Sequence, residues 1–100
     1  MRLIPAIALA TLLPASLMAG DGAAVFKASC ASCHGQDAKG QTPVGKSLKI
    51  KDLHTAEVQK ESAADLAKVI SDGKGKMPAF KSKLTKAQID DVVAYIKSLK

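Results

Sequence analysis

The chain has 100 residues, with 15 lysines and arginines against 9 aspartates and glutamates, so its formal net charge is +6. A hydrophobic fraction of 47% together with 24% charged residues excludes a disordered or collagen-like chain. The length suits one small domain, but only 3% of the residues are aromatic, and a core this poor in large side chains usually needs a further stabilising element.

The first twenty residues have the pattern of an export signal. Arg2 precedes an almost entirely apolar segment over 3–19, and small and polar residues follow. A positive start, a short apolar stretch and a small-residue exit are typical of a secretory signal peptide. We therefore expect residues 1–19 to be cleaved, which leaves a domain of residues 20–100 in the periplasm without stable membrane insertion. An uncleaved membrane anchor is the alternative, because the apolar segment is at the lower length limit for a span.

The first helix comes next in the chain. Asp21 could cap a helix that runs to about Cys33, with Phe26 on its buried side. No alternating strand pattern follows residue 20, so the sequence predicts an all-helical fold. All positive charge beyond Arg2 is lysine. Export, the absence of arginine and the scarcity of aromatic residues argue against nucleic-acid binding.

Both cysteines of the chain lie at the end of this predicted helix, in the run Cys30-Ala31-Ser32-Cys33-His34. A redox dithiol usually follows a strand, which is absent from the pattern here. A zinc site needs further ligands, and His54 is the only other histidine. Covalent haem attachment is the third interpretation, for which Cys-x-x-Cys-His is the recognised spacing. Two thiols on one side of a helical turn can each react with a vinyl group, and the adjacent histidine can reach the iron. The sequence favours haem.

Residues 35–51 contain three glycines and a proline with few large apolar residues, so we expect a loop there. A short helix is predicted over 55–60. Another is predicted between a capping Ser62 and a terminating Gly73.

A loop with Met77 follows, and this residue is the only methionine beyond residue 20. Pro78 disfavours helical geometry at Met77, which leaves a thioether on a stiff, extended segment. Such a residue would suit the sixth position of a haem iron and raise the reduction potential. A methionine packed under the loop and ligation by His54 are the alternatives, and we favour Met77 because His54 is placed in a polar loop ahead of a helix.

The last predicted helix begins at a capping box formed by Thr85 and Gln88. It carries a stripe of apolar residues at helical spacing, with Tyr95 at its edge: Ile89, Val92, Val93, Ile96 and Leu99. This stripe must pack on another element. We expect it to pack on the first helix, where Gly22 permits close backbone approach beside Phe26.

Over residues 21–100 the chain resembles the small single-haem class I cytochromes c of bacteria. The similarity lies in residues 30–39, in Thr42-Pro43-x-Gly45-Lys46, and in the run from Gly75 to Phe80. It implies a cytochrome c-like helical fold around one covalently attached haem c, with packed terminal helices. It also implies a monomeric one-electron carrier rather than an enzyme.

The resemblance also implies roles for single residues. Cys30 and Cys33 would form the thioethers, with His34 and Met77 as axial ligands. The carbonyl of Pro43 would accept a hydrogen bond from the ligand histidine and fix its ring. The usual donors to the haem propionates are absent or replaced, because no tryptophan occurs and no arginine lies beyond Arg2.

Lysines gather around both motifs and suggest a class of partner. They are Lys74, Lys76, Lys81 and Lys83 around the methionine and Lys39, Lys46, Lys49 and Lys51 after the cysteines. Charge of one sign speeds encounter with an oppositely charged protein, so we expect redox partners with an acidic docking patch. A solvated surface without a docking role is the alternative for the lysines. For the chain, the alternatives are an accessory subunit of a larger respiratory or dehydrogenase complex and a peroxidase-type haem enzyme, which would need an open iron position.

Overall fold

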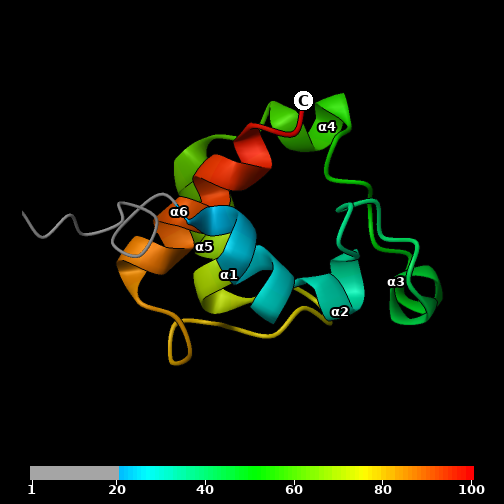
Figure 1. The fold of residues 1–100 in the computed structure, drawn as a ribbon, viewed down its shortest axis with the longest axis horizontal. Helices are drawn as coiled ribbons and strands as arrows, with labels where there is room; N and C mark the ends of the chain where they lie inside the picture. Colours follow the sequence, from blue (N-terminus) through cyan, green and yellow to red (C-terminus); the bar gives the residue numbers. More distant parts are fainter. Residues whose placement is uncertain (1–20) are drawn as a thin grey trace, which may run out of the picture.

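A computed structural model of the protein describes residues 21–100, which form six helices (Figure 1). The predicted signal peptide lies outside the described residues. The helices are α1 (Gly22–Ser29), α2 (Ala31–His34), α3 (Pro43–Leu48), α4 (Ala56–Gln59), α5 (Ala63–Asp72) and α6 (Lys86–Lys97). Within residues 21–100 there is no β-strand, and one isolated bridge pairs Lys74 with Met77. The expectation of an all-helical fold is confirmed.

The two terminal helices of this region, α1 and α6, pack against each other, as predicted (Figure 1). A Cβ atom on Gly22 would lie 2.0 Å from the carbonyl oxygen of Asp91, so only glycine allows the backbones to come this close. One turn later, the ring of Phe26 lies 5.3 Å from that of Tyr95, and Phe26 is 1% exposed. This contact joins the two ends of the domain.

Local capping determines where α5 and α6 begin. The Ser62 side chain accepts a hydrogen bond of 3.0 Å from the amide of Asp65. Thr85 and Gln88 form the complete capping box predicted for α6. Leu66 on α5 is buried, and four residues of α6 are buried with it: Ile89, Val92, Val93 and Ile96. These helices therefore begin at the residues that the sequence predicts, and they bury the predicted faces.

The first helix is shorter than expected. It ends at Ser29; Cys30, with φ of −118°, forms a turn, and α2 then carries Cys33 and His34. Asp21 occupies the N-cap position as expected, but its side chain makes no capping hydrogen bond.

The expectation of a loop over residues 35–51 is also wrong, because α3 forms within it. Thr42 caps this helix by accepting a hydrogen bond of 2.8 Å from the amide of Gly45. Pro43 occupies the first turn, where its missing N–H is not needed. Lys49 ends the helix in the left-handed conformation, with φ of 58°. A cap and a proline thus outweigh the low helix propensity of the glycine-rich stretch.

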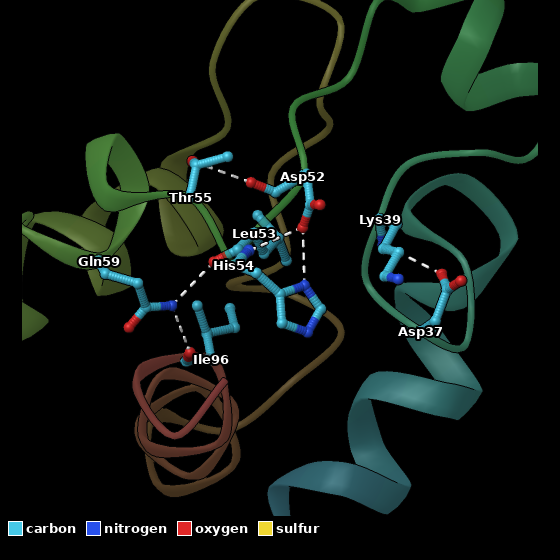
Figure 2. Close-up of polar contacts among 8 residues, drawn as sticks. All are labelled: Asp37, Lys39, Asp52, Leu53, His54, Thr55, Gln59 and Ile96. Carbon is cyan, nitrogen blue, oxygen red and sulfur yellow. Dashed lines mark hydrogen bonds and ion pairs between the residues drawn. The ribbon is translucent and has the colours of Figure 1, made fainter. Parts of the chain in front are cut away.

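A polar clamp ties the segment before α4 to the end of α6. The side-chain amide of Gln59 donates to the carbonyl oxygens of Leu53 at 2.8 Å and Ile96 at 2.9 Å (Figure 2). The ammonium of Lys97 donates to the carbonyls of Gln59 at 2.5 Å and Glu61 at 2.7 Å. Four backbone carbonyls of this region are thereby satisfied by two side chains.

We expect Gln59→Ala to lower the free energy of unfolding by about 1–3 kcal/mol, because the carbonyl of Leu53 loses its side-chain donor and that of Ile96 loses one of two donors. Urea unfolding of the haem-loaded protein measures this loss. Gln41→Ala, at an exposed position, serves as the control. Equal midpoints for the two variants would show that the clamp contributes nothing.

The described residues contain no helix with the length and apolar character that crossing a membrane requires.

Candidate functional site

The cysteine–histidine motif occupies a single turn at the junction of α1 and α2. The amides of Cys33 and His34 donate to the carbonyl of Cys30 at 3.2 Å and 2.9 Å. Residues three and four apart in such a turn lie on one side, so the geometry agrees with the expectation that both thiols face one cofactor. Both cysteines have free thiols and are available for other chemistry.

Two cavities lie against this turn. One has a volume of about 390 Å³ and extends to Lys51; we call it the Lys51 cavity. The other has a volume of about 410 Å³ and includes Cys33; we call it the Cys33 cavity. Four residues line both of them: Cys30, His34, Lys74 and Met77. The four predicted haem-binding residues, Cys30, Cys33, His34 and Met77, all line the Cys33 cavity, so the structure brings them together.

The walls of both cavities are mostly apolar. The Lys51 cavity is lined by Phe26, Leu53, Val58, Leu66, Val69, Ile70, Val92 and Ile96. The Cys33 cavity is lined by Leu48, Ile50, Pro78 and Phe80 among others. Each volume falls within the range of roughly 300–1,000 Å³ found for ligand and cofactor sites. An apolar space beside two thiols, an imidazole and a thioether fits the chemistry of a porphyrin with a bound iron.

Burial shifts the pKa values of Cys30 and His34 toward their neutral forms. It raises the pKa of the Cys30 thiol to about 11, and the neighbouring Cys33 adds a smaller effect in the same direction. Burial also lowers the pKa of His34. A neutral imidazole has the free lone pair that a metal ligand needs. The ring centroid of His34 lies 6.1 Å from that of Phe26.

The hydrogen bond expected from His34 to the Pro43 carbonyl is not formed. The Nδ1 atom of His34 is buried and has no hydrogen-bond partner among the described residues. Pro43 is exposed and opens α3, where a carbonyl points along the helix axis toward the amide four residues ahead. The role that the resemblance implies for Pro43 in the haem-loaded protein therefore stays a prediction.

Thr42 makes a contact between α2 and α3. Its hydroxyl donates a hydrogen bond of 2.6 Å to the carbonyl of Cys33. Beside it, a Cβ atom on Gly45 would lie 2.7 Å from that same carbonyl, so α3 approaches the motif closely. Threonine directly before proline is a helix-start signal, which marks Thr42 as a cap but does not predict its contact with Cys33.

The loop that carries Met77 is closed on itself. The amide of Lys74 donates to the carbonyl of Met77 at 3.1 Å, and the amide of Met77 donates to the carbonyl of Lys74 at 3.0 Å. Gly73 has φ of +81°, and a Cβ atom there would lie 2.7 Å from the Met77 carbonyl. This tight loop leaves Met77 half-buried, packed on the hydrophobic core and lining both cavities.

His54, the rival ligand, is engaged elsewhere. Its Nδ1 atom lies 2.7 Å from Oδ1 of Asp52, and its backbone amide donates to the same oxygen at 2.8 Å (Figure 2). These bonds, the backbone one foremost, lower the pKa of Asp52. His54 lines neither the Lys51 cavity nor the Cys33 cavity. A wider groove of about 720 Å³ along α5 and α6 contains no residue of the motif.

Comparison with known proteins agrees with this site. A family model described as cytochrome c oxidase, cbb3-type, subunit III matches residues 18–96. The chain is 41% identical over 76 residues to cytochrome c6 of Nostoc sp., covering 76% of this chain and 66% of the relative. It therefore spans slightly less than two thirds of that protein. It is 40% identical over 78 residues to cytochrome c6 of Leptolyngbya boryana, covering 78% of this chain and 88% of the relative.

The fold is also found in a solved structure. The c-type cytochrome KustC0563 superimposes with a TM-score of 0.73 at 30% identity, covering 79% of this chain and 96% of that one. A mutant of the same cytochrome gives a TM-score of 0.71 at 32% identity. The chain thus belongs to the family described by the cbb3-type subunit III model, and it is a small class I c-type cytochrome, a class whose members carry covalently attached haem c.

Proposed function

We propose that this chain carries single electrons between redox proteins, and that Cys30, Cys33, His34 and Met77 hold its haem. The convergence of these four side chains on the two adjoining cavities carries the proposal. When bound, haem c supplies the Fe(II)/Fe(III) couple. The polypeptide contributes attachment, axial ligands and an environment of low polarity.

Each proposed residue has a distinct task. The thiols of Cys30 and Cys33 would anchor the cofactor through thioether bonds, whose formation adds sulfur and hydrogen across a vinyl group and needs no oxidant. The neutral imidazole of His34 and the thioether of Met77 would provide a nitrogen and a sulfur donor. If both residues bind the iron, no open site would be left on it for a substrate, which suits a carrier and not a peroxidase.

The attachment is tested on protein matured in a host that loads c-type haem. We expect the intact mass to equal that of the polypeptide plus one haem, and the haem stain to survive denaturation. A double variant, Cys30→Ala with Cys33→Ala, should lose the stain, whereas Ser32→Ala, which lies between the two cysteines, should keep it. A colourless wild-type protein with the mass of the polypeptide alone would contradict the proposal.

The same mass measurement tests the export signal. We propose that residues 1–19 are removed and that residues 20–100 act in the periplasm, supported by the charge and apolar pattern of this segment. A mature mass that still includes residues 1–19 would contradict cleavage.

We further propose an acidic docking patch on the partner. All the lysines that surround Met77 are exposed: Lys74, Lys76, Lys81 and Lys83. Three of them, Lys74, Lys76 and Lys83, line the Cys33 cavity, so positive charge lies beside the proposed haem site. Such charge attracts an oppositely charged partner toward this face and so raises the association rate. Dissolved salt screens this attraction.

We expect the second-order rate of electron transfer to an acidic redox partner to fall by about tenfold or more as ionic strength rises from 0.01 to 0.15 M. Stopped-flow kinetics measure this rate. Lys76→Gln should reduce the low-salt rate, whereas Lys100→Gln, at the end of the chain, should not. Rates that do not depend on ionic strength would contradict electrostatic steering.

A second candidate is a subunit that works inside a larger complex. The family description, which names an oxidase subunit, favours it. Gel filtration of the native periplasmic fraction separates the two, because a free carrier elutes at the mass of one chain with haem.

A further inference from the structure

The charged groups that line the Lys51 cavity bear on how the cofactor is oriented. Haem carries two propionate carboxylates, and arginine and tryptophan, which often bind them, are absent beyond Arg2. Among the described residues, the cations that line this cavity are Lys51 and Lys74, and the acid is Glu61. A lysine is therefore the available cationic partner.

The two thiols define which end of the site receives the propionates. On a haem, the vinyl groups and the propionates lie on opposite sides of the ring. Cys33 lines the Cys33 cavity and not the Lys51 cavity. If the vinyl groups are held by Cys30 and Cys33, as the proposed function requires, the propionates point away from Cys33 and into the Lys51 cavity.

The position of each lysine then separates the two candidates. Lys74 lines both cavities. Its backbone is hydrogen-bonded to that of Met77, so Lys74 lies next to the proposed iron ligand. Lys51 lines only the Lys51 cavity, together with Leu53, Val58 and Glu61. Lys51 is thus the cation at the end without Cys33.

The side chain of Lys51 is free to change partner. Its Nζ atom lies 2.5 Å from Oε1 of Glu57, and the two side chains are 62% and 63% exposed. Exposed ion pairs contribute little stability, so the ammonium can leave Glu57 at small cost. A haem propionate at the mouth of an apolar cavity would be less hydrated than Glu57, and would therefore be a better partner for the ammonium of Lys51.

We propose that Lys51 is the cationic partner of a haem propionate in this cytochrome. The interaction gives Lys51 a role in cofactor binding rather than in docking. It also places Glu57 in competition with the propionate for the same ammonium.

The test measures the pKa values of the two propionates in the haem-loaded protein. Haem labelled with ¹³C at the propionate carboxyls reports the pKa of each group by NMR. Because a nearby cation favours the charged carboxylate, we expect Lys51→Gln to raise one propionate pKa by about one unit. Lys51→Arg should keep it near the wild-type value. Lys60→Gln removes the same charge from an exposed residue that lines neither cavity, and should leave it unchanged.

A second variant tests the same contact in the opposite direction. Glu57→Gln frees the ammonium of Lys51 from its ion pair, so it should lower the same propionate pKa. This readout remains if Lys51→Gln fails to load haem. The other charged groups near this end are Glu61 and Lys74 along the cavity and the Asp52–His54 pair, and all are retained in the variants.

Equal propionate pKa values in wild type, Lys51→Gln and Glu57→Gln would overturn the proposal. So would a shift produced by Lys74→Gln and not by Lys51→Gln. Failure of the proposed function is distinguishable, because it would show in the wild-type protein as missing covalent haem or missing methionine ligation before any lysine is changed.

Discussion

Met77→Ala is expected to lose the sixth iron ligand while the haem stays covalently attached. Methionine as an axial ligand raises the reduction potential, and axial ligands tune haem potentials over roughly 0.8 V, so we expect the midpoint to fall on the order of 0.2 V. The reduced variant should also bind carbon monoxide readily at neutral pH. Spectroelectrochemistry and the methionine–iron charge-transfer band of the oxidised protein measure both effects.

His54→Ala is the matched control for this experiment. His54 is bonded to Asp52 and lines neither cavity, so its removal should leave the charge-transfer band and the midpoint potential close to wild type. An unchanged low-spin spectrum in Met77→Ala, or loss of the band in His54→Ala, would show that the ligand is assigned to the wrong residue.

Gly22→Ala is expected to destabilise the domain, although alanine favours helices over glycine by about 0.8–1.0 kcal/mol. The new methyl group would lie 2.0 Å from the carbonyl oxygen of Asp91 and 3.0 Å from the Cβ atom of Tyr95. A backbone oxygen cannot rotate away, so α1 must shift from α6. Overpacking of this kind costs about 1–3 kcal/mol or more, which outweighs the gain in helix propensity.

Thermal unfolding of the haem-loaded protein measures this cost. A loss of 1 kcal/mol corresponds to a decrease in Tm of roughly 4–8 °C for a domain of this size. The control is Ala24→Ser, on the same helix and exposed, which should change the Tm little. A Tm for Gly22→Ala at or above wild type would contradict the close approach of the two helices.

The expected helical elements and the structure agree best where capping and periodicity act locally. Ser62 caps α5, Thr85 and Gln88 cap α6, and α4 lies within the predicted residues 55–60. These patterns depend on neighbours within one turn, so they can be read from the chain alone. For α3 the same kind of local signal, Thr42 before Pro43, is present in the sequence, and in the structure it outweighs the glycine content on which the expectation of a loop rested.

The candidate site also has a part that the sequence predicts and a part that it does not. The spacing of Cys30, Cys33 and His34 defines a turn by itself, and therefore predicts which thiols and which imidazole can serve one haem. Neither the hydrogen-bond partner of Cys33 nor the clamp by Gln59 has a local signature, because Gln59 contacts a carbonyl 37 residues away in the chain. Contacts between distant segments depend on how helices pack.

The sequence by itself therefore determined the helices with strong caps, the chemistry of the cofactor and the candidate ligands, since all of these depend on residue type and short spacing. The tertiary structure decided which candidates meet: it placed Met77 at both cavities, kept His54 out of them, and left the Nδ1 atom of His34 without the expected partner. It also placed Lys51 at the end of the site away from Cys33. The physical reason is that a side chain's neighbours across the fold are fixed by the packing of whole helices, which no local pattern records.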